Sequence, residues 1–423
     1  MSYLAIEPLR KEAPSDWKWL PLRRVAKLRR VRNEASDALL LALSSERGVE
    51  PRPNDGGRQP PSEETISGYW LVEPDDLVFN PMWAIGGGVA VSQVRGAVST
   101  AYRVYSLTGH LLPRFLHYYV RCDAAIQQYA LVIRGTTTFD RSVTRDDFEM
   151  MPVPIPPLPQ QRAIADYLDR ETGRIDALIE KKRDLTERLA ERRQALITLA
   201  VQGDVGPGAA SRGDGVSEIR PLRAYAEVAL GRQRSPQHEE GSHMTPYLRA
   251  ANVKDGILDL TDVKEMNFAP PEQQMFSLKK GDVLVTEGSG SLGSVGASAV
   301  WSSEIEGPVC FQNTLLRLRP RPGTDPRFLA WWCRHAFADG IFASVALGAN
   351  IFHVSADRVR ALPLRYVSLS TQRAVADYLD RETARIDALI AKINQQLDLL
   401  TEHRQALITA AVTGELDVPE VAA

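Results

Sequence analysis

The 423-residue chain has an ordinary composition for a folded protein, with 44% hydrophobic and 25% charged residues. Its length allows two or three domains, and no apolar run reaches the ~18 residues that a membrane span requires. A net charge of −2 and a pI near 6.4 exclude the strong basic excess of a protein that binds nucleic acid by itself. Any contact with DNA is therefore expected to use local patches or to depend on partners.

The N-terminal residues lack the basic-then-apolar pattern of a secretory signal. Three cysteines, Cys122, Cys310 and Cys333, have neither metal-ligand spacing nor the density of a disulfide framework. We expect reduced, partly buried thiols, no metal site and a cytoplasmic protein.

A cluster of basic residues lies near the start of the chain, in residues 17–32. Its members are Lys18, Arg23, Arg24, Lys27, Arg29, Arg30 and Arg32. Such a cluster indicates either a nucleic-acid contact or the solvated face of an amphipathic helix, and the sequence leaves both open.

The next notable segment is Asn80-Pro81-Met82-Trp83, followed by three glycines at positions 86–88. It is one residue short of the Asn-Pro-Pro-aromatic motif with which adenine methyltransferases hold a flipped base. Met82 replaces the second proline, and no strand–glycine–helix unit supplies a cofactor loop. The favoured interpretation is a strand end and a turn in which glycines let the backbone bend. We find no other catalytic motif.

The strongest signal is an internal repeat. Residues 161–205 and 372–416 align without a gap at a constant offset of 211 and are identical at most positions. Both copies keep apolar residues at every seventh position, which is typical of a coiled-coil seam, with one interruption at Lys182. The predicted seam consists of Leu168, Ile175, Leu189 and Leu196, and of Leu379, Ile386, Ile393, Leu400 and Leu407.

Leu389 and Leu397 widen the second stripe. Pro159 is expected just before the first helix, Ser370 as the N-cap of the second, and Gly203 and Gly414 at the two C-terminal ends. About 40 helical residues would form a rod of roughly 60 Å.

The repeat extends into the segments before each helix. Residues 112–121 match residues 325–334, and weaker echoes join 21–28 to 221–228 and 74–80 to 280–286. We therefore expect one globular domain at 1–157, a helix at 158–205, a glycine-rich linker at 206–216, a second domain at 217–367, a second helix at 368–416 and a tail at 417–423. Helices that pair within one chain would be antiparallel, with the two domains at opposite ends about a pseudo-two-fold axis.

These residues resemble the specificity subunit of a Type I restriction–modification enzyme. The resemblance rests on "PPLPQQRAIADYLD" and "STQRAVADYLD", which open the helices, on "RQALIT" followed by "AV" and glycine, which closes both, and on "NPMWAIGGGVAVSQVRGAVSTAYRVY" and "LKKGDVLVTEGSG" in the domains. It implies an α+β fold in which two mixed α/β target-recognition domains are separated by two long antiparallel coiled-coil helices.

The resemblance also implies a function. Each domain would read one half of a bipartite site on double-stranded DNA, and the helices would set the gap and dock two modification (methyltransferase) subunits. The chain itself would hold no cofactor and perform no catalysis. S-adenosylmethionine, ATP and Mg would belong to the modification subunits and to the restriction/translocase subunits. No membrane contact is expected.

Polar loops rich in arginine, amide and hydroxyl side chains are the expected DNA contacts, because these groups bind base edges and phosphates. The candidates in the first domain are Arg29, Arg30, Arg32, Arg134, Thr136, Thr137 and Arg141. Those in the second are Arg232, Gln233, Arg234, Ser289, Ser291, Asn350 and His353.

Polar residues that are identical in both helices are candidates for docking two copies of one partner. They are Asp166, Tyr167, Arg170 and Glu171, and Asp377, Tyr378, Arg381 and Glu382. Two alternatives stay open. A purely structural adaptor is disfavoured because the two domains differ so strongly from each other, and a self-contained methyltransferase is disfavoured by the missing motifs.

Overall fold

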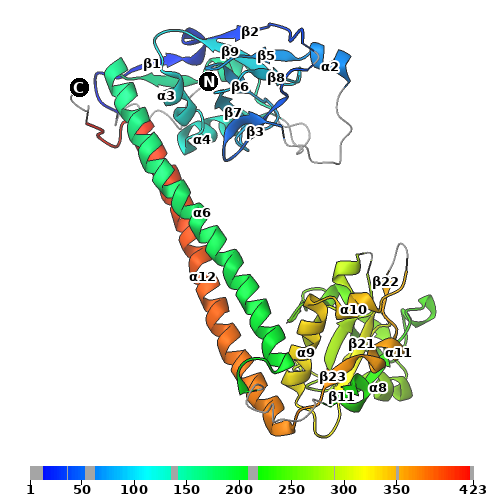
Figure 1. The fold of residues 1–423 in the computed structure, drawn as a ribbon. Coiled ribbons are helices and arrows are strands. Elements are labelled where there is room, and N and C mark those ends of the chain that lie inside the picture. The colour runs from blue at the N-terminus through cyan, green and yellow to red at the C-terminus, as the bar shows by residue number, and fades with distance from the viewer. Residues whose placement is uncertain are drawn as a thin grey trace. The chain divides into compact units, whose positions relative to one another are not determined.

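A computed structural model describes residues 13–35, 37–52, 62–134, 142–207, 218–289, 291–348 and 352–419. The chain forms two compact units, Met1–Arg183 with Asn394–Ala423, and Asp184–Ile393. Each unit contains one globular domain of strands and short helices and a portion of each of two long helices, α6 (Leu158–Gln202) and α12 (Leu369–Thr413) (Figure 1). The mixed α+β architecture with two long helices that the sequence predicts is confirmed.

The first domain is built on an antiparallel four-stranded sheet with strand order β2-β9-β6-β7. The hairpin β3–β4 and the antiparallel pairs β5–β8 and β1–β10 complete it. The strands are β1 (Lys18–Pro21), β2 (Ala26–Arg29), β3 (Leu41–Ser44), β4 (Gly48–Pro51), β5 (Trp70–Val72), β6 (Leu77–Phe79), β7 (Val89–Val91), β8 (Gly96–Val98), β9 (Arg103–Leu107) and β10 (Pro152–Ile155). The helices are η1 (Leu22–Arg24), α2 (Glu63–Ser67), α3 (Pro113–Tyr119), α4 (Asp123–Val132) and α5 (Arg145–Glu149).

The second domain repeats this plan with the order β12-β21-β17-β19 and the pair β11–β23. It adds the sheet β16-β13-β20 and the pairs β14–β15 and β18–β22. The strands are β11 (Ile219–Pro221), β12 (Ala226–Leu230), β13 (Met244–Leu248), β14 (Val253–Lys254), β15 (Ile257–Leu258), β16 (Lys264–Asn267), β17 (Val283–Thr286), β18 (Gly288–Ser289), β19 (Ser298–Val300), β20 (Cys310–Phe311), β21 (Leu315–Pro320), β22 (Phe352–His353) and β23 (Pro363–Arg365). The helices are η2 (Leu222–Ala224), η3 (Pro236–His238), η4 (Ala250–Asn252), α8 (Pro270–Phe276), η5 (Leu292–Ser294), α9 (Pro326–Ala338), α10 (Ile341–Ser344) and α11 (Ala356–Ala361).

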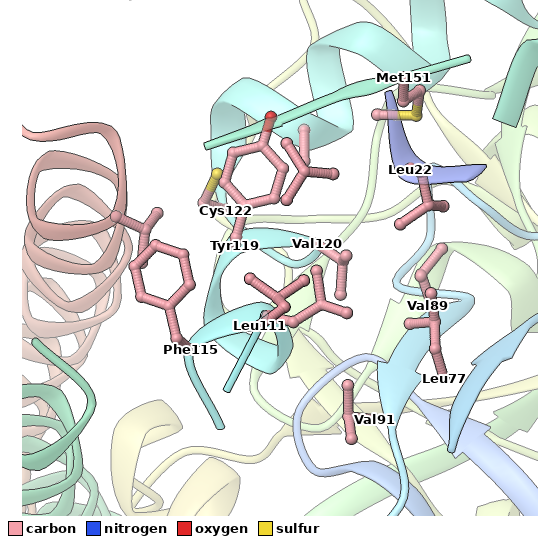
Figure 2. Packing of buried hydrophobic residues seen from close by; sticks show 14 of the residues in the cluster. Leu22, Leu77, Val89, Val91, Leu111, Phe115, Tyr119, Val120, Cys122 and Met151 are labelled. Carbon is pink, nitrogen blue, oxygen red and sulfur yellow. The ribbon is translucent and has the colours of Figure 1, made fainter. Parts of the chain in front are cut away.

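The core of each domain forms between the central sheet, the helix α3 or α9, and one end of a long helix. In the first unit, apolar residues of β6 and β7 face those of α3 (Figure 2), and Ile408 and Val412 of α12 join the same cluster. In the second unit, Ile197 and Val201 of α6 take the equivalent place. Burial of apolar surface is the main stabilising term in folding, so each domain is held to helix ends by the same contacts that form its core.

A buried glutamine at the start of each long helix reinforces this junction. The side chain of Gln161, 1% exposed, accepts a hydrogen bond from the amide of Leu112 (2.7 Å) and donates to the carbonyl oxygens of His110 (3.1 Å) and Pro156 (2.9 Å). The equivalent bonds of Gln372 are with the amide of Asp325 (2.8 Å) and the carbonyl oxygens of Gly323 (3.3 Å) and Val367 (3.0 Å).

Segments of α6 and α12 pair antiparallel within each unit. In the first, the carboxylate of Asp176 accepts a bond from Arg404 (2.8 Å), and Lys182 donates to Gln396 (2.6 Å). In the second, Arg193 lies 2.8 Å from Asp387. Of the predicted seam residues, Leu168, Leu379, Ile386 and Ile393 are buried, and Ile175, Leu189, Leu196, Leu400 and Leu407 are half-buried.

Several local predictions need correction. Residues 17–32 do not form an amphipathic helix but β1, η1 and β2. Leu389 does not widen the seam, since it is 51% exposed. The helix α12 starts at Leu369, where the hydroxyl of Ser368 and not of Ser370 accepts the amide of Thr371 (3.2 Å).

The glycines end the helices as predicted. α6 ends directly before Gly203 and α12 directly before Gly414, and their φ angles of 77° and 86° lie in the left-handed region that glycine adopts without strain. The three cysteines are free and buried. Within the described ranges, every helix is too short or too polar to cross a membrane.

Candidate nucleic-acid interface

The first group of candidate side chains lies at the end of β2 and directly after it. Arg29 is half-buried and forms ion pairs with Asp76 (2.5 Å) and Glu73 (3.8 Å) of the same domain. Burial raises the pKa of the Asp76 carboxyl, and this effect outweighs the neighbouring Arg29, which lowers it. Arg30 and Arg32 are exposed, and the guanidinium of Arg32 lies 4.1 Å from the ring centre of Trp70. Arg30 and Arg32 therefore lie at the surface, whereas Arg29 is used within the domain.

The second domain places its candidates at the same position, directly after β12. Arg232 is only 7% exposed and binds the carbonyl oxygen of Asn267 (2.5 Å) and Glu272 (3.0 Å). Because the charge of Arg232 is paired inside the domain, this residue is not available for a DNA contact. Gln233 and Arg234 are exposed, and Arg234 forms an ion pair with Glu239 (2.9 Å).

Arg234 lines a groove with a volume of about 380 Å³, together with side chains that are not predicted from the sequence. These are Tyr247, Arg249, Lys264 and Gln312. Pairing of β13 with β16 and β20 brings them together from separate parts of the chain. Arginine, lysine, glutamine and tyrosine are the residue types that contact bases and phosphates.

In each domain, the loop after the central strand is hydrogen-bonded to the segment that precedes α5 or α11. The amide of Val143 donates to the carbonyl of Pro81 (3.0 Å), and the amide of Val354 donates to the carbonyl of Glu287 (2.8 Å). The two domains thus build the same paired-loop site at the ends of β6 and β17.

The remaining candidates converge on these paired loops. Arg134 has a 60% exposed side chain and an ion pair with Asp147 (3.0 Å). Where β18 pairs with β22, Gly288 lies opposite His353 and Ser289 lies opposite Phe352, and the imidazole Nδ1 of His353 lies 2.9 Å from the Glu287 carboxylate. Ser291 directly precedes η5. Thr136, Thr137, Arg141 and Asn350 lie outside the described residues.

A second duplicated surface lies at the start of the long helices. Arg114 of α3 forms ion pairs with Asp166 (2.6 Å) and Asp169 of α6. In the second unit, Arg327 of α9 pairs with Asp377 (2.7 Å) and Asp380 (2.9 Å) of α12. Asp166 and Asp377, both docking candidates, thus contact the domain of their own unit.

The other docking candidates form one network of half-buried and exposed side chains in each unit. Glu171 binds Arg170 (3.0 Å) and Arg174 (3.0 Å), and Arg170 lies 5.6 Å from the ring centre of Tyr167. The hydrogen bond from Arg170 is the largest influence that lowers the pKa of Glu171. The equivalent network comprises Tyr378, Arg381, Glu382 and Arg385.

An exposed leucine extends each network by one further turn. Leu178 is 43% exposed and its equivalent Leu389 is 51% exposed. Because residues three or four apart share a helix face, Tyr167, Glu171, Arg174 and Leu178 form one stripe. Its counterpart is Tyr378, Glu382, Arg385 and Leu389. We call these two sets the helix stripes. The seven-residue apolar pattern predicts that Leu389 widens the seam, so the helix stripes could not be predicted from it.

Comparison with known families places a match in the second half of the chain. Residues 226–399 match the family model described as Type I restriction modification DNA specificity domain. The chain is 29% identical over 173 residues to the specificity subunit of the Type I restriction enzyme StySPI of Salmonella potsdam, covering 40% of this chain and 36% of that protein. It is 22% identical over 273 residues to the EcoKI specificity subunit of Escherichia coli K12, covering 64% of this chain and 58% of that protein. The chain thus matches less than two thirds of the length of either relative.

Solved structures share the fold over nearly the whole chain. A chain from a structure that describes complex assembly and conformational transition of a type I R-M system aligns with a TM-score of 0.69 and 19% identity, covering 96% of this chain and 99% of that chain. The HsdS subunit of Thermoanaerobacter tengcongensis aligns with a TM-score of 0.56 and 19% identity, covering 96% and 98%.

Proposed function

We propose that this chain is a specificity subunit of a Type I restriction–modification enzyme and that its two domains read the two halves of a bipartite sequence in double-stranded DNA. The matching family model and the similar specificity subunits support this proposal. In this proposal the chain recognises DNA and catalyses no reaction. It acts in the cytoplasm of a prokaryotic cell, and S-adenosylmethionine, ATP and Mg belong to the partner subunits.

The observation that carries the proposal is the duplication of the sheet, of the paired loops and of the junction between domain and helix. Strand orders β2-β9-β6-β7 and β12-β21-β17-β19 are equivalent. The buried Gln161 and Gln372 make the same three bonds in the two units. Two domains joined in the same way to long helices are suited to binding two half-sites at a fixed separation. The spacing of half-sites follows the spacing of the domains that bind them.

The side chains at the candidate interface differ between the two domains, although its position is shared. After β2 the exposed arginines are Arg30 and Arg32, whereas after β12 the exposed pair is Gln233 and Arg234. Arginine favours guanine and glutamine favours adenine in the major groove. The differences therefore support two half-sites of different sequence.

The helix stripes are the proposed docking sites for two modification subunits. A single partner that binds two sites requires the same side chains twice, and Tyr167, Glu171, Arg174 and Leu178 recur without change in the second stripe. Tyr167 and Glu171 are half-buried and Arg174 and Leu178 are exposed, and seam packing does not require any of them to be identical. An exposed leucine beside paired charges is also the kind of apolar centre with a polar rim that protein interfaces use.

Stoichiometry tests the docking proposal. We expect the wild-type chain, co-expressed with its modification subunit, to purify with two copies of it. Leu178→Asp and Leu389→Asp should each leave one copy bound, and the double variant none. Leu399→Asp is the matched control, because Leu399 lies elsewhere on α12 and is 62% exposed in the wild type. Two copies retained by the double variant would refute the assignment of the stripes.

A further inference from the structure

The segment Asn80–Gly88, which resembles a methyltransferase motif without completing it, forms a closely bonded loop. The amide of Asn80 donates to the carbonyl of Gly88 (2.7 Å), and the carbonyl of Trp83 accepts the amides of Gly86 (3.0 Å) and Gly88 (2.9 Å). The Oδ1 of Asn80 accepts the amide of Met82 (3.1 Å). These bonds fix the backbone, so the loop presents its side chains in one arrangement.

Glycine backs the tryptophan of this loop. A Cβ atom at Gly86 would lie 2.1 Å from Nε1 and 2.6 Å from Cδ1 of the Trp83 indole. The indole therefore rests directly on the backbone of Gly86, which covers part of one side of the ring. Trp83 is nevertheless 40% exposed, so a flat aromatic surface is open to solvent on a rigid support.

The exposed apolar surface of the loop is concentrated. Met82 is 59% exposed and Ile85 is 39% exposed, on either side of Trp83. Clusters of exposed apolar residues mark binding surfaces more often than isolated ones do.

The loop also belongs to the candidate DNA interface of the first domain. Val143, one residue after the bridge between Arg134 and Ser142, donates to the carbonyl of Pro81 in the loop. The equivalent position in the second domain, after β17, carries Glu287 and glycine and serine residues in place of an aromatic side chain. An aromatic contact at this position would therefore serve one half-site only.

A cavity beside the loop is lined by charged side chains of both signs. Ala84 to Gly87 line a cavity of about 370 Å³ with Arg121, Arg404, Glu46 and Asp123, and Arg404 is paired with Asp176 (2.8 Å). Arg121 donates to the carbonyl oxygens of Ser44 (3.2 Å) and Ser45 (2.6 Å), which do not neutralise its charge. Burial, reinforced by the charge of Arg404, lowers the pKa of Arg121 to about 10.

We propose that Trp83 stacks on a nucleobase of the target DNA, with Met82 against the same base or its neighbour, as a specificity contact of the first domain. The proposal rests on the proposed function. A planar ring with one open face matches the face of a base, and base–aromatic stacking is a recurrent source of affinity for nucleic acids. Apolar side chains also enter between base steps in duplex DNA.

The test uses the full complex of the chain with its modification subunits. The probes are a synthetic duplex that carries the sequence the wild-type complex methylates and a shuffled duplex of the same length and composition. We expect Trp83→Ala to weaken binding of the first duplex by roughly five- to 150-fold, as a stacking contact worth about 1–3 kcal/mol requires. Trp83→Phe should recover most of this loss. Gly86→Ala should reproduce it, because its methyl group displaces the indole.

Two further readouts separate stacking from other roles. Loss of a stacking contact leaves the salt dependence of binding unchanged, whereas loss of a phosphate contact reduces its slope. Leu131→Ala, at a 59% exposed position on α4, is the control and should bind as the wild type does. Thermal unfolding establishes that each variant is folded.

The outcomes distinguish the contact from the function on which it rests. Equal affinity of wild type and Trp83→Ala for the first duplex, with the wild type still rejecting the shuffled one, overturns the stacking contact alone. Loss of modification subunits from Trp83→Ala, with DNA affinity per assembled complex unchanged, overturns it in favour of a protein-docking loop. A wild-type complex that binds both duplexes equally overturns the proposed function and the contact together.

Discussion

Replacing Gln161 or Gln372 by alanine tests whether the two domain–helix junctions are equivalent. Each glutamine is 1% exposed and makes three hydrogen bonds to backbone groups. Alanine leaves one amide and two carbonyl oxygens without these partners, at a cost of about 1 kcal/mol or more for each. We therefore expect each variant to lower the free energy of unfolding of its own unit by about 3 kcal/mol.

Urea unfolding and amide hydrogen exchange together provide the assay. Exchange should rise at the amide of Leu112 in Gln161→Ala and at the amide of Asp325 in Gln372→Ala, with no rise in the other unit. Gln395→Ala, at an exposed position on α12, is the control and should change stability by less than about 0.5 kcal/mol. A loss below about 1 kcal/mol in either glutamine variant would refute the reasoning.

Three other predictions follow from single side chains. Burial, reinforced by Arg121, lowers the pKa of His117 to about 4, below the ~6.5 of an unfolded chain. The unfolded state therefore binds the proton first, so the stability that neutral His117 contributes to the first unit should be lost as pH falls from about 6.5 to 4. His117→Gln should reduce this loss in pH-dependent unfolding. Arg327→Ala should cost less than about 1 kcal/mol in urea unfolding, because its ion pairs with Asp377 and Asp380 are exposed to solvent. Burial raises the pKa of the Cys122 thiol to about 12, so iodoacetamide should leave it unlabelled in the folded chain and label it in urea, as mass spectrometry will show.

The long helices could be predicted from the sequence because their determinants are local. The seven-residue apolar repeat and the terminal glycines at Gly203 and Gly414 are sufficient to define α6 and α12 within a few residues. The same reasoning failed at Leu389. A heptad pattern records which residues are apolar, but it does not record where the partner helix ceases to cover them.

The candidate interface could be predicted only in part, because long-range strand pairing assembles it. Arg234 is predicted from the sequence as a polar loop residue, and it is exposed. Arg249, Lys264 and Gln312 join Arg234 only through the pairing of β13 with β16 and β20. The burial of Arg232 had no local signal either, since the residues that bind it, Asn267 and Glu272, come from a distant strand and helix.

Methylation of DNA by the assembled complex tests the central claim most directly. Genomic DNA from cells that lack this gene would be methylated in vitro by the purified complex, and modified adenines would be mapped by sequencing. The account predicts methylation at one motif made of two specified halves around an unspecified gap, and none when this chain is omitted. Methylation at a single contiguous motif, or the same methylation without this chain, would contradict it.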